Sequence, residues 1–331
     1  MRLGVADSRL DPPGESMARS TRPAIAAAVD IGSYSVHLLV AEVDGHALRV
    51  VHDESAFLGL GRRLVETGRL GAARSTLRET IEGYVAHAAS LEAASITLVA
   101  TDPLRRAADA AGAVDDIRAS TGLDVVVLEH EEEAMLALIG VLAGRPLRRD
   151  VVMVDVGGGS TEVLTGGPKR PISAVGLPLG AARLTGVHIA ADPPAPIELL
   201  ALRSEVRAAM AAAPPFDADE LVAVGGTARS LLRVGPPSPN RTLSARRIRR
   251  ALEVIATSDA ASLSERFNVR LSRARVLAAG ATILAAALEH YELSQLRVAA
   301  GGLREGVILA AHRAGPAWRT DLPVLVRGWS R

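Results

Sequence analysis

Residues 28–39 read AVDIGSYSVHLL, and residues 153–164 read MVDVGGGSTEVL. Each stretch runs from an apolar segment through an aspartate into a turn of glycine and serine, and then into a second apolar segment. Five positions match without a gap at an offset of 125 residues: Val29 with Val154, Asp30 with Asp155, Gly32 with Gly157, Ser35 with Ser160 and Leu39 with Leu164. Hairpins of this composition are common, but ungapped matches that open two comparable halves of the chain favour a duplicated domain over chance.

The segments around the first hairpin predict a three-stranded meander and then alternating helices and strands. The strands are expected at residues 24–29, 36–42 and 48–51, with a turn at Asp44-Gly45. The elements expected after them are a helix over 76–91, a strand at 96–100, a helix from Pro103, a strand at 124–128 and a helix over 131–142.

The second half of the chain repeats this order more loosely. Strands are expected at 151–154, 162–164, 221–224 and 296–299, and the chain from residue 245 onward is largely helical. A run of strands followed by alternating strands and helices occurs twice along the chain, and this order is typical of a two-domain α/β protein. We expect a disordered N-terminal tail over 1–23, domains over 24–147 and 148–315, and a C-terminal tail over 316–331.

Composition narrows the class of protein. A chain of 331 residues is too long for one compact core, and 48% hydrophobic with 23% charged residues is ordinary for a globular protein. The 38 basic and 37 acidic residues give a net charge of +1, which argues against a nucleic-acid partner. The absence of cysteine excludes a disulfide scaffold and a thiolate metal site.

Neither a membrane span nor a signal peptide is expected. The longest apolar stretch, residues 276–288, is too short to cross a bilayer. Residues 1–23 lack the apolar segment of a signal peptide. We therefore expect a cytoplasmic protein with no membrane partner.

The two hairpin turns have the composition of phosphate-binding loops. Consecutive glycine and serine residues expose backbone N–H groups and allow a phosphate to approach closely. Neither turn is a P-loop, because GxxxxGK[ST] does not occur in the chain. The stronger cradle is expected from Gly157, Gly158, Gly159 and Ser160, and the weaker one from Gly32, Ser33 and Ser35.

An aspartate ends the first strand of each hairpin. The carboxylates of Asp30 and Asp155 are hard oxygen ligands of the kind that Mg²⁺ prefers. Two hairpins that face one cleft would hold Mg²⁺ between these carboxylates, directly or through water. The alternative is that both aspartates only form turns, and the repeat favours the metal site.

The hairpins resemble the two phosphate motifs of the actin, sugar kinase and Hsp70 superfamily, and VAVGGTARS at 222–230 is similar to its later glycine-rich motif. Within that group the chain resembles the exopolyphosphatase/guanosine pentaphosphate phosphohydrolase (Ppx/GppA) family, from about residue 25 to about residue 312. The supporting segments are ATDPLRRAAD at 100–109, EEEA at 131–134, LPLGAARL at 177–184 and GGLREGVI at 301–308. The chain resembles the short, two-domain form of the family.

This resemblance implies an α/β fold of two ribonuclease H-like (actin-like ATPase) domains with a cleft between them. It implies hydrolysis of the terminal phosphoanhydride of inorganic polyphosphate, or of the 5′ γ-phosphate of pppGpp, with Mg²⁺ or Mn²⁺ as the cofactor. Glu133 matches the family's water-activating glutamate, although by residue type alone it would only decorate a helix N-terminus. Arg105 matches an arginine that binds phosphate.

Other matched residues have two interpretations each. The turn of Gly225, Gly226 and Thr227 matches a nucleotide contact of the kinases, which in a phosphatase contacts phosphate or only packs. Glu162 either holds a metal-bound water or points outward from its strand. Arg304 forms either a structural ion pair or a ligand contact.

Two residues near the first turn depart from the family pattern. Tyr34 stands where a small polar residue is usual, and Phe57 stands where we expect an arginine. A phenol at Tyr34 would narrow the cleft or stack on a base, and Phe57 removes a phosphate contact.

The alternatives to polyphosphate hydrolysis are therefore a pppGpp phosphohydrolase, a kinase acting between ATP and an acceptor, and a non-catalytic sensor of polyphosphate or (p)ppGpp. The sequence also leaves a homodimer open.

Overall fold

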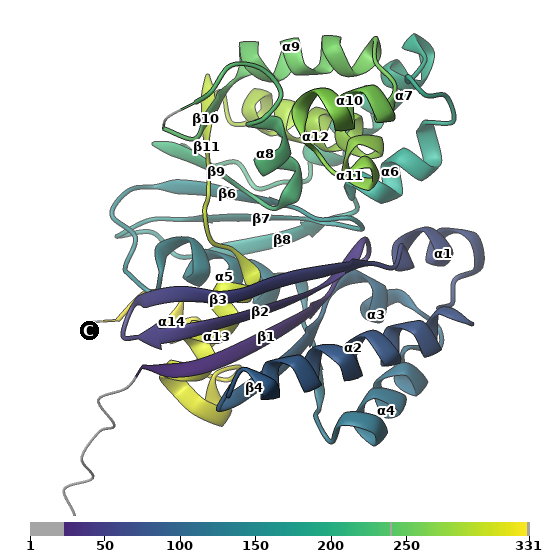
Figure 1. Ribbon diagram of the computed structural model, residues 1–331. Helices are drawn as coiled ribbons and strands as arrows, with labels where there is room; N and C mark the ends of the chain where they lie inside the picture. The colour runs from purple at the N-terminus through teal and green to yellow at the C-terminus, as the bar shows by residue number, and fades with distance from the viewer. Residues whose placement is uncertain (1–22, 239, 330–331) are drawn as a thin grey trace, which may run out of the picture.

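Two mixed β-sheets lie one above the other at the centres of two lobes (Figure 1). The computed structural model describes residues 23–238 and 240–329. The five-stranded sheet has the order β3-β2-β1-β4-β5, and the six-stranded sheet has the order β10-β11-β9-β6-β7-β8. None of the helices in the described part of the chain is long and apolar enough to span a membrane.

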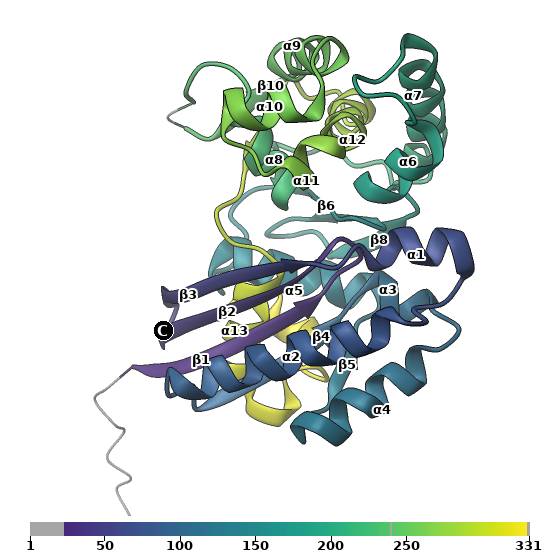
Figure 2. The same cartoon turned by 45° about the vertical axis from the view of Figure 1, so that its right-hand side comes forward.

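The first lobe opens with the predicted meander, in which β1 pairs with β2 and β2 with β3, all antiparallel. Strands β4 and β5 then extend the sheet parallel to β1. The strands are β1 (Ala24–Ile31), β2 (Ser35–Asp44), β3 (Ala47–Phe57), β4 (Ser95–Ala100) and β5 (Val125–Val127). The helices are α1 (Leu60–Thr67), α2 (Ala73–Ser90), α3 (Asp102–Arg106), α4 (Ala110–Thr121) and α5 (His130–Leu142). Helices α2 and α4 lie on the outer side of this sheet (Figure 2).

The second lobe holds six strands and seven helices before the chain crosses back. Its strands are β6 (Val151–Val156), β7 (Thr161–Gly166), β8 (Ser173–Leu177), β9 (Glu220–Val224), β10 (Thr242–Ser244) and β11 (Gln295–Val298). Its helices are α6 (Ala181–His188), α7 (Pro196–Met210), α8 (Gly226–Leu231), α9 (Ala245–Ala256), α10 (Ala260–Phe267), α11 (Leu271–Arg275) and α12 (Leu277–His290).

The two sheets share one topology. Without the short edge strand β10, the second sheet runs β8-β7-β6-β9-β11, which is the order of the first sheet with each strand replaced by its counterpart. Strand β6 pairs antiparallel with β7 and parallel with β9, as β1 does with β2 and β4. The predicted α/β class and the duplication read from matched positions are confirmed.

Some elements were not predicted. The structure adds β8, β10, α1, α6, α7 and α8 to the expected set. Helix α7 begins at a proline-rich segment that favours a loop by composition, but Pro196 occupies the first helical turn, where the missing N–H has no partner to lose. The helix expected from Pro103 is two helices, α3 and α4, because the Asp109 carboxylate between them binds the backbone N–H groups of Leu70 and Gly71.

The C-terminal segment packs on the first lobe. Helix α13 (Leu303–Ala314) follows β11 and contacts α5 and β1. The expected tail over 316–331 is wrong for residues up to 329. A 3₁₀ turn (Gly315–Ala317) and α14 (Leu322–Leu325) bury Trp318 and Leu322 beside α5 because the apolar side chains gain a shared core. Residues 1–22 of the expected N-terminal tail lie outside the described residues. The domain boundary expected between residues 147 and 148 stays a prediction.

Helices α5 and α13 touch through their backbones. A Cβ atom added at Gly306 would overlap the carbonyl oxygen of Leu136, and one added at Gly140 would overlap that of Gly302. Close-packed interiors leave no room to relieve such overlaps without moving a helix. This crossing therefore requires glycine on both helices, and it joins the chain that follows β11 to the first lobe.

We expect Gly306→Ala to lower the free energy of unfolding by about 1–3 kcal/mol, because the added methyl group overpacks the crossing. Gly83→Ala is the matched control: Gly83 lies in α2 with nothing within 4 Å of an added Cβ, so it should be neutral or stabilising by up to about 1 kcal/mol. Guanidinium unfolding measures both. Unfolding of Gly306→Ala at the wild-type midpoint would contradict the close crossing.

Candidate active site

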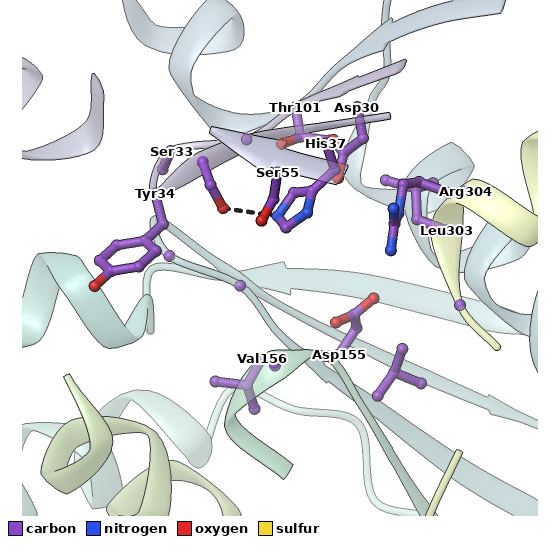
Figure 3. A pocket seen from close by; sticks show the side chains of 18 of the residues that line it. Asp30, Ser33, Tyr34, His37, Ser55, Thr101, Asp155, Val156, Leu303 and Arg304 are labelled. Atoms are coloured by element: carbon purple, nitrogen blue, oxygen red, sulfur yellow. Dashed lines mark hydrogen bonds between the residues drawn. The ribbon is translucent and has the colours of Figure 1, made fainter. Parts of the chain in front are cut away.

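A cavity of about 330 Å³ lies between the lobes, where both hairpin turns meet. Figure 3 shows Asp30 and His37 on the side of the first lobe and Asp155 and Val156 on the side of the second. The predicted site residues that line this cavity are Asp30, Gly32, Ser33, Ser35, Glu133, Asp155, Gly157, Gly158, Gly159, Ser160, Gly225 and Gly226. Two hairpins 125 positions apart in sequence therefore share one cleft.

The two turns close in the same way. The N–H of Gly32 donates to the carbonyl of Ser35 at 3.2 Å, and the N–H of Gly157 donates to the carbonyl of Ser160 at 3.0 Å. A Cβ at Gly157 would lie 2.9 Å from that carbonyl oxygen, so glycine is required there. The matched spacing of glycine and serine in the sequence therefore reflects one hydrogen-bonded turn formed twice.

The carbonyl groups of the second turn are bound by helix α6. The carbonyls of Gly157 and Gly158 accept hydrogen bonds from Ala181 and Ala182, at 2.9 and 3.0 Å, in the first turn of α6. A trans peptide places its N–H opposite its carbonyl. The N–H groups of Gly158 and Gly159 are therefore turned away from α6, as a phosphate cradle requires.

The turns of the two lobes also press against each other. A Cβ at Gly158 would lie 2.9 Å from the Tyr34 Cβ, and one at Gly159 would overlap the Asp102 carboxylate. The Ser33 hydroxyl donates to this same carboxylate at 2.6 Å. Because these residues of the second turn are glycines, the two lobes can meet at one end of the cavity.

Asp30 and Asp155 face this cavity from the ends of β1 and β6. Burial raises the pKa of Asp30 to about 7, with Arg304 opposing the rise and Asp155 adding to it. Burial likewise raises the pKa of Asp155 to about 6, against the charge of Arg229. Among the described residues, Oδ1 of Asp30 has no hydrogen-bond partner. Among the described residues neither carboxylate forms an ion pair, so the charges of Arg304 and Arg229 offset the cost of burial only in part.

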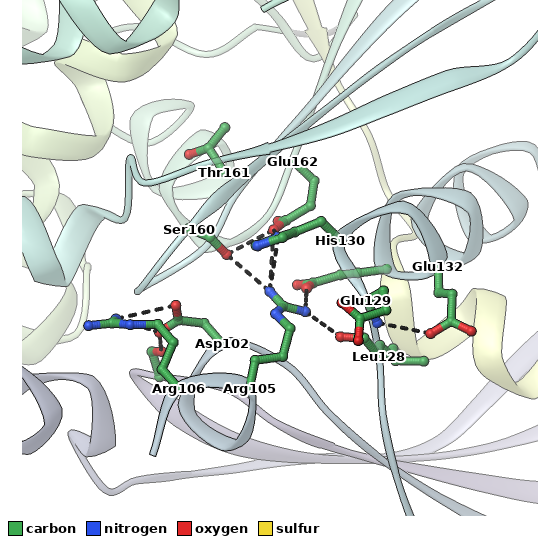
Figure 4. Close-up of polar contacts among 12 residues, drawn as sticks. Asp102, Arg105, Arg106, Leu128, Glu129, His130, Glu132, Ser160, Thr161 and Glu162 are labelled. Carbon is green, nitrogen blue, oxygen red and sulfur yellow. Dashed lines mark hydrogen bonds and ion pairs between the residues drawn. The ribbon is translucent and has the colours of Figure 1, made fainter. Parts of the chain in front are cut away.

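Arg105 is the centre of a buried polar network (Figure 4). Its Nη1 donates to Oε2 of Glu133 at 2.8 Å and to the carbonyl of Leu128 at 2.6 Å. Its Nη2 lies 3.1 Å from Nδ1 of His130 and 3.6 Å from Oε1 of Glu162. The guanidinium thus joins Glu133 of α5 to Glu162 of β7, and so links the two lobes.

The pKa values of both glutamates are raised. Burial raises the pKa of Glu133 well above its ordinary value, the charge of Glu162 raises it further, and Arg105 opposes both effects. Burial also raises the pKa of Glu162. The ligand atoms of His130, Glu133 and Glu162 lie within 4.8 Å of one another, close enough to hold a metal ion. The Arg105 guanidinium contacts all three of these side chains, so Arg105 supplies the positive charge at this cluster.

Three predicted site residues do not line the cavity: Arg105, Glu162 and Thr227. Glu162 is fully buried and accepts a hydrogen bond from Ser160 at 2.8 Å, so the alternative that it points outward is wrong. Thr227 is also fully buried, and a Cβ at Gly280 of α12 would overlap its side chain. Thr227 therefore packs α8 against α12. Of the two interpretations given for this turn, the packing role applies to Thr227.

Arginines that the sequence did not single out line the same cavity. Arg229, Arg270 and Arg273 project from the second lobe. Nearly every basic residue of the chain is an arginine, so residue type alone does not mark these three. Arg304 pairs with Asp53 at 2.5 Å, as one of its two interpretations expected, and it also lines the cavity; its contact with a ligand stays a prediction.

Ser35 is held by His37, which lies two residues further along β2. Its Oγ lies 2.7 Å from Nε2 of His37. Burial lowers the pKa of His37 to about 3, and the charge of Arg304 lowers it further. His37 is therefore a neutral hydrogen-bond partner for Ser35 at neutral pH.

Comparisons with known proteins agree with this geometry. The sequence model of the Ppx/GppA phosphatase family matches residues 39–313. Exopolyphosphatase 1 of Mycobacterium tuberculosis is 31% identical over 307 residues, which cover 85% of this chain and 86% of that protein. Guanosine-5′-triphosphate,3′-diphosphate pyrophosphatase of Pseudoalteromonas atlantica is 25% identical over 85% of this chain and 57% of that protein.

A solved structure gives the same answer for the fold. The crystal structure of the Aquifex aeolicus member of the Ppx/GppA family superposes with a TM-score of 0.74 at 28% identity, covering 88% of this chain and 99% of that one. The two-domain actin-like architecture implied by the resemblance is thereby confirmed. The family match extends over most of the chain and includes the glycine–serine turn of the second lobe and cavity residues such as Glu133. The chain belongs to the Ppx/GppA phosphatase family and is a phosphoanhydride hydrolase.

Proposed function

We propose that this chain is an exopolyphosphatase, in which Glu133 deprotonates the water that attacks the terminal phosphate of inorganic polyphosphate. The observation that carries the proposal is that the Glu133 carboxylate lines the same cavity as both glycine–serine turns. A phosphoryl group held by those turns lies next to a carboxylate. The name of the M. tuberculosis relative, exopolyphosphatase 1, supports the same substrate.

The surroundings of Glu133 suit a general base. A base works best when its pKa is near the operating pH, and burial moves the pKa of Glu133 in that direction. Arg105 holds Oε2 of this carboxylate at 2.8 Å. We therefore assign Arg105 to positioning Glu133, in place of the direct phosphate contact expected from the sequence.

The remaining parts supply positioning and charge. Phosphoryl transfer needs little covalent help from a protein, so catalysis relies on orienting the reactants and stabilising charge on the transferred group. Backbone N–H groups of the turns and four arginines, Arg229, Arg270, Arg273 and Arg304, surround the cavity. Fixed donors of this kind act strongly where water is excluded.

The residues of the cavity fit a divalent cation between Asp30 and Asp155. Both carboxylates have raised pKa values through burial, and Oδ1 of Asp30 has no hydrogen-bond partner among the described residues. Carboxylate oxygens are the ligands of choice for Mg²⁺ and also suit Mn²⁺. Such an ion, when bound, would neutralise charge on the phosphate oxygens. Oε2 of Glu162 is likewise without a partner, and its predicted part in the metal site remains a proposal.

Polyphosphate suits the cavity better than pppGpp. The one aromatic side chain among the residues that line the described cavity, apart from His37, is Tyr34. The Arg273 guanidinium lies over the Tyr34 ring at 4.9 Å, and Phe57 contacts that ring at 4.8 Å between centroids. A guanine base would have to displace one of them to stack there. The Glu133 carboxylate and both glycine–serine turns are present in one cavity, which also favours a hydrolase over a non-catalytic sensor.

Glu133→Gln should lower kcat by about 10²- to 10⁴-fold, because an amide cannot accept the proton of the attacking water. Binding of polyphosphate should persist, since the turns and arginines are unchanged. Release of phosphate from long-chain polyphosphate in the presence of Mg²⁺ measures the effect. Glu131→Gln, an exposed residue of the same helical turn, should remain near wild type. Near-wild-type turnover by Glu133→Gln would remove Glu133 as the base.

The rate should depend on pH through the raised pKa of Glu133. The carboxylate accepts a proton only when ionised, so kcat should fall as the pH drops through a pKa clearly above the ordinary value of 4.5. Arg105 lowers this pKa, so Arg105→Gln should move the fall in kcat to higher pH. Arg106→Gln is the control, because Arg106 pairs with Asp102 instead. An unmoved acid limb in Arg105→Gln contradicts the assignment.

Removal of divalent cations with EDTA should abolish turnover, and Mg²⁺ should restore it. Asp155→Asn should raise the Mg²⁺ concentration for half-maximal rate by about tenfold or more, since a neutral amide is a weaker ligand. Asp150→Asn, at the residue that precedes β6 and lies outside the cavity, should leave this concentration unchanged. Equal Mg²⁺ requirements in wild type and Asp155→Asn would exclude Asp155 as a ligand.

A further inference from the structure

A second hollow adjoins the cavity and is lined mainly by arginine. It has a volume of about 430 Å³ and shares Gly226, Arg229, Arg270 and Arg273 with the cavity. From there it continues past the end of α8 to the strand β10 side of the second lobe, where Arg233 and Arg241 line it. We call this hollow the arginine groove; its arginines are Arg229, Arg233, Arg241, Arg270 and Arg273.

The charge of the arginine groove is not balanced. Some arginines elsewhere in the chain pair with carboxylates, as Arg297 does with Glu220 at 2.5 Å and Arg304 with Asp53 at 2.5 Å. Within residues 23–238 and 240–329, no carboxylate forms an ion pair with any of the five groove arginines. Five guanidinium groups without an acidic partner make a strongly positive surface.

Neutral partners hold these arginines in place. Nε and Nη2 of Arg241 donate to the carbonyls of Val298 and Ala299 at 3.1 and 3.0 Å, and Arg233 donates to the carbonyl of Asn268. A carbonyl orients a guanidinium but leaves its charge uncompensated. The groove is therefore ordered before any ligand arrives, which lowers the entropy lost on binding.

The arginines at the junction with the cavity repel one another. Burial lowers the pKa of Arg273, and the neighbouring charges of Arg229 and Arg270 lower it further. The Arg273 guanidinium lies against Gly226, where a Cβ would be 2.7 Å from Nη2. A bound anion would relieve this repulsion at the point where the cavity opens into the groove.

We propose that the arginine groove binds the part of a linear polyphosphate chain that lies beyond the phosphate being cleaved. The assignment rests on the proposed exopolyphosphatase function and adds the path of the remaining substrate. Guanidinium groups bind phosphate oxygens in bidentate pairs, and a row of them suits a repeating polyanion.

A nucleoside suits the groove poorly. Among the described residues that line it, none is aromatic, and Leu232 and Val269 are the large apolar ones. The groove therefore offers no aromatic face to a purine, whereas its five guanidinium groups match the repeating charge of an inorganic chain. The chemistry of the groove favours an inorganic chain over a nucleotide.

The test compares a substrate that reaches the groove with one that does not. Arg233 lines the groove but not the cavity, so Arg233→Gln removes a groove charge and Arg233→Glu reverses it. KM for long-chain polyphosphate should rise by roughly fivefold in Arg233→Gln and more in Arg233→Glu, while kcat/KM for tripolyphosphate changes less than about twofold. Arg250→Gln on α9, an exposed arginine outside both hollows, is the matched control.

Three results would overturn the assignment. The first is unchanged KM for long-chain polyphosphate in both Arg233 variants. The second is an equal loss in Arg250→Gln, which would indicate a general charge effect. The third is a loss of affinity for pppGpp in Arg233→Gln that equals the loss for long-chain polyphosphate, because the groove would then serve a nucleotide.

A direct binding measurement separates this inference from the proposed function. If the wild-type protein releases no phosphate from either substrate, the exopolyphosphatase proposal fails. Equilibrium binding of long-chain polyphosphate to the wild type, the Arg233 variants and Arg250→Gln then still decides the groove. Binding weakened only in the Arg233 variants supports it, and equal binding by all four proteins overturns it.

Discussion

The close approach of the two glycine–serine turns is the constraint on which the site depends. Gly158 and Gly159 come so near to Tyr34 and Asp102 that any side chain on these glycines would overlap the opposite lobe. The contact closes one end of the cleft, next to the second turn, whose N–H groups lie on the side away from α6. Duplication alone would not produce this site, because two turns on separate surfaces cannot surround one phosphate.

Burial of charge is the second organising feature. Asp30, Asp155, Glu133 and Glu162 are all held where ionisation is unfavourable, as their raised pKa values indicate. The protein balances only part of this charge itself, through Arg105 at the two glutamates. Among the residues that the structure describes, neither aspartate forms an ion pair with an arginine, and no groove arginine forms one with a carboxylate. This separation of unpaired negative and positive charge along one cleft suits a metal ion at one position and a polyanion at the next.

The predictions succeeded where a residue's role follows from its local context. The turns, the aspartates after β1 and β6, and Gly225 and Gly226 were found because each lies at the end of a buried strand in a recognisable motif. Arg229, Arg270 and Arg273 were missed, because they come from α8, α11 and the loop before it, with no shared pattern in sequence. Thr227 and Arg105 do not line the cavity: Thr227, for which the sequence left packing and phosphate contact open, packs against α12, and Arg105 pairs with Glu133.

The sequence by itself determined the α/β class, the duplication and the family, since these follow from the succession of apolar and turn segments along the chain and from the residues of the local motifs. Only the tertiary structure decided which arginines gather at the cleft, that α13 and the segment after it return to the first lobe, and that Arg105 is committed to a glutamate. Those outcomes depend on contacts between residues far apart in sequence, such as Arg304 with Asp53 and Gly306 with Leu136. Such contacts are selected by the packing of whole lobes, and local sequence patterns carry no record of them.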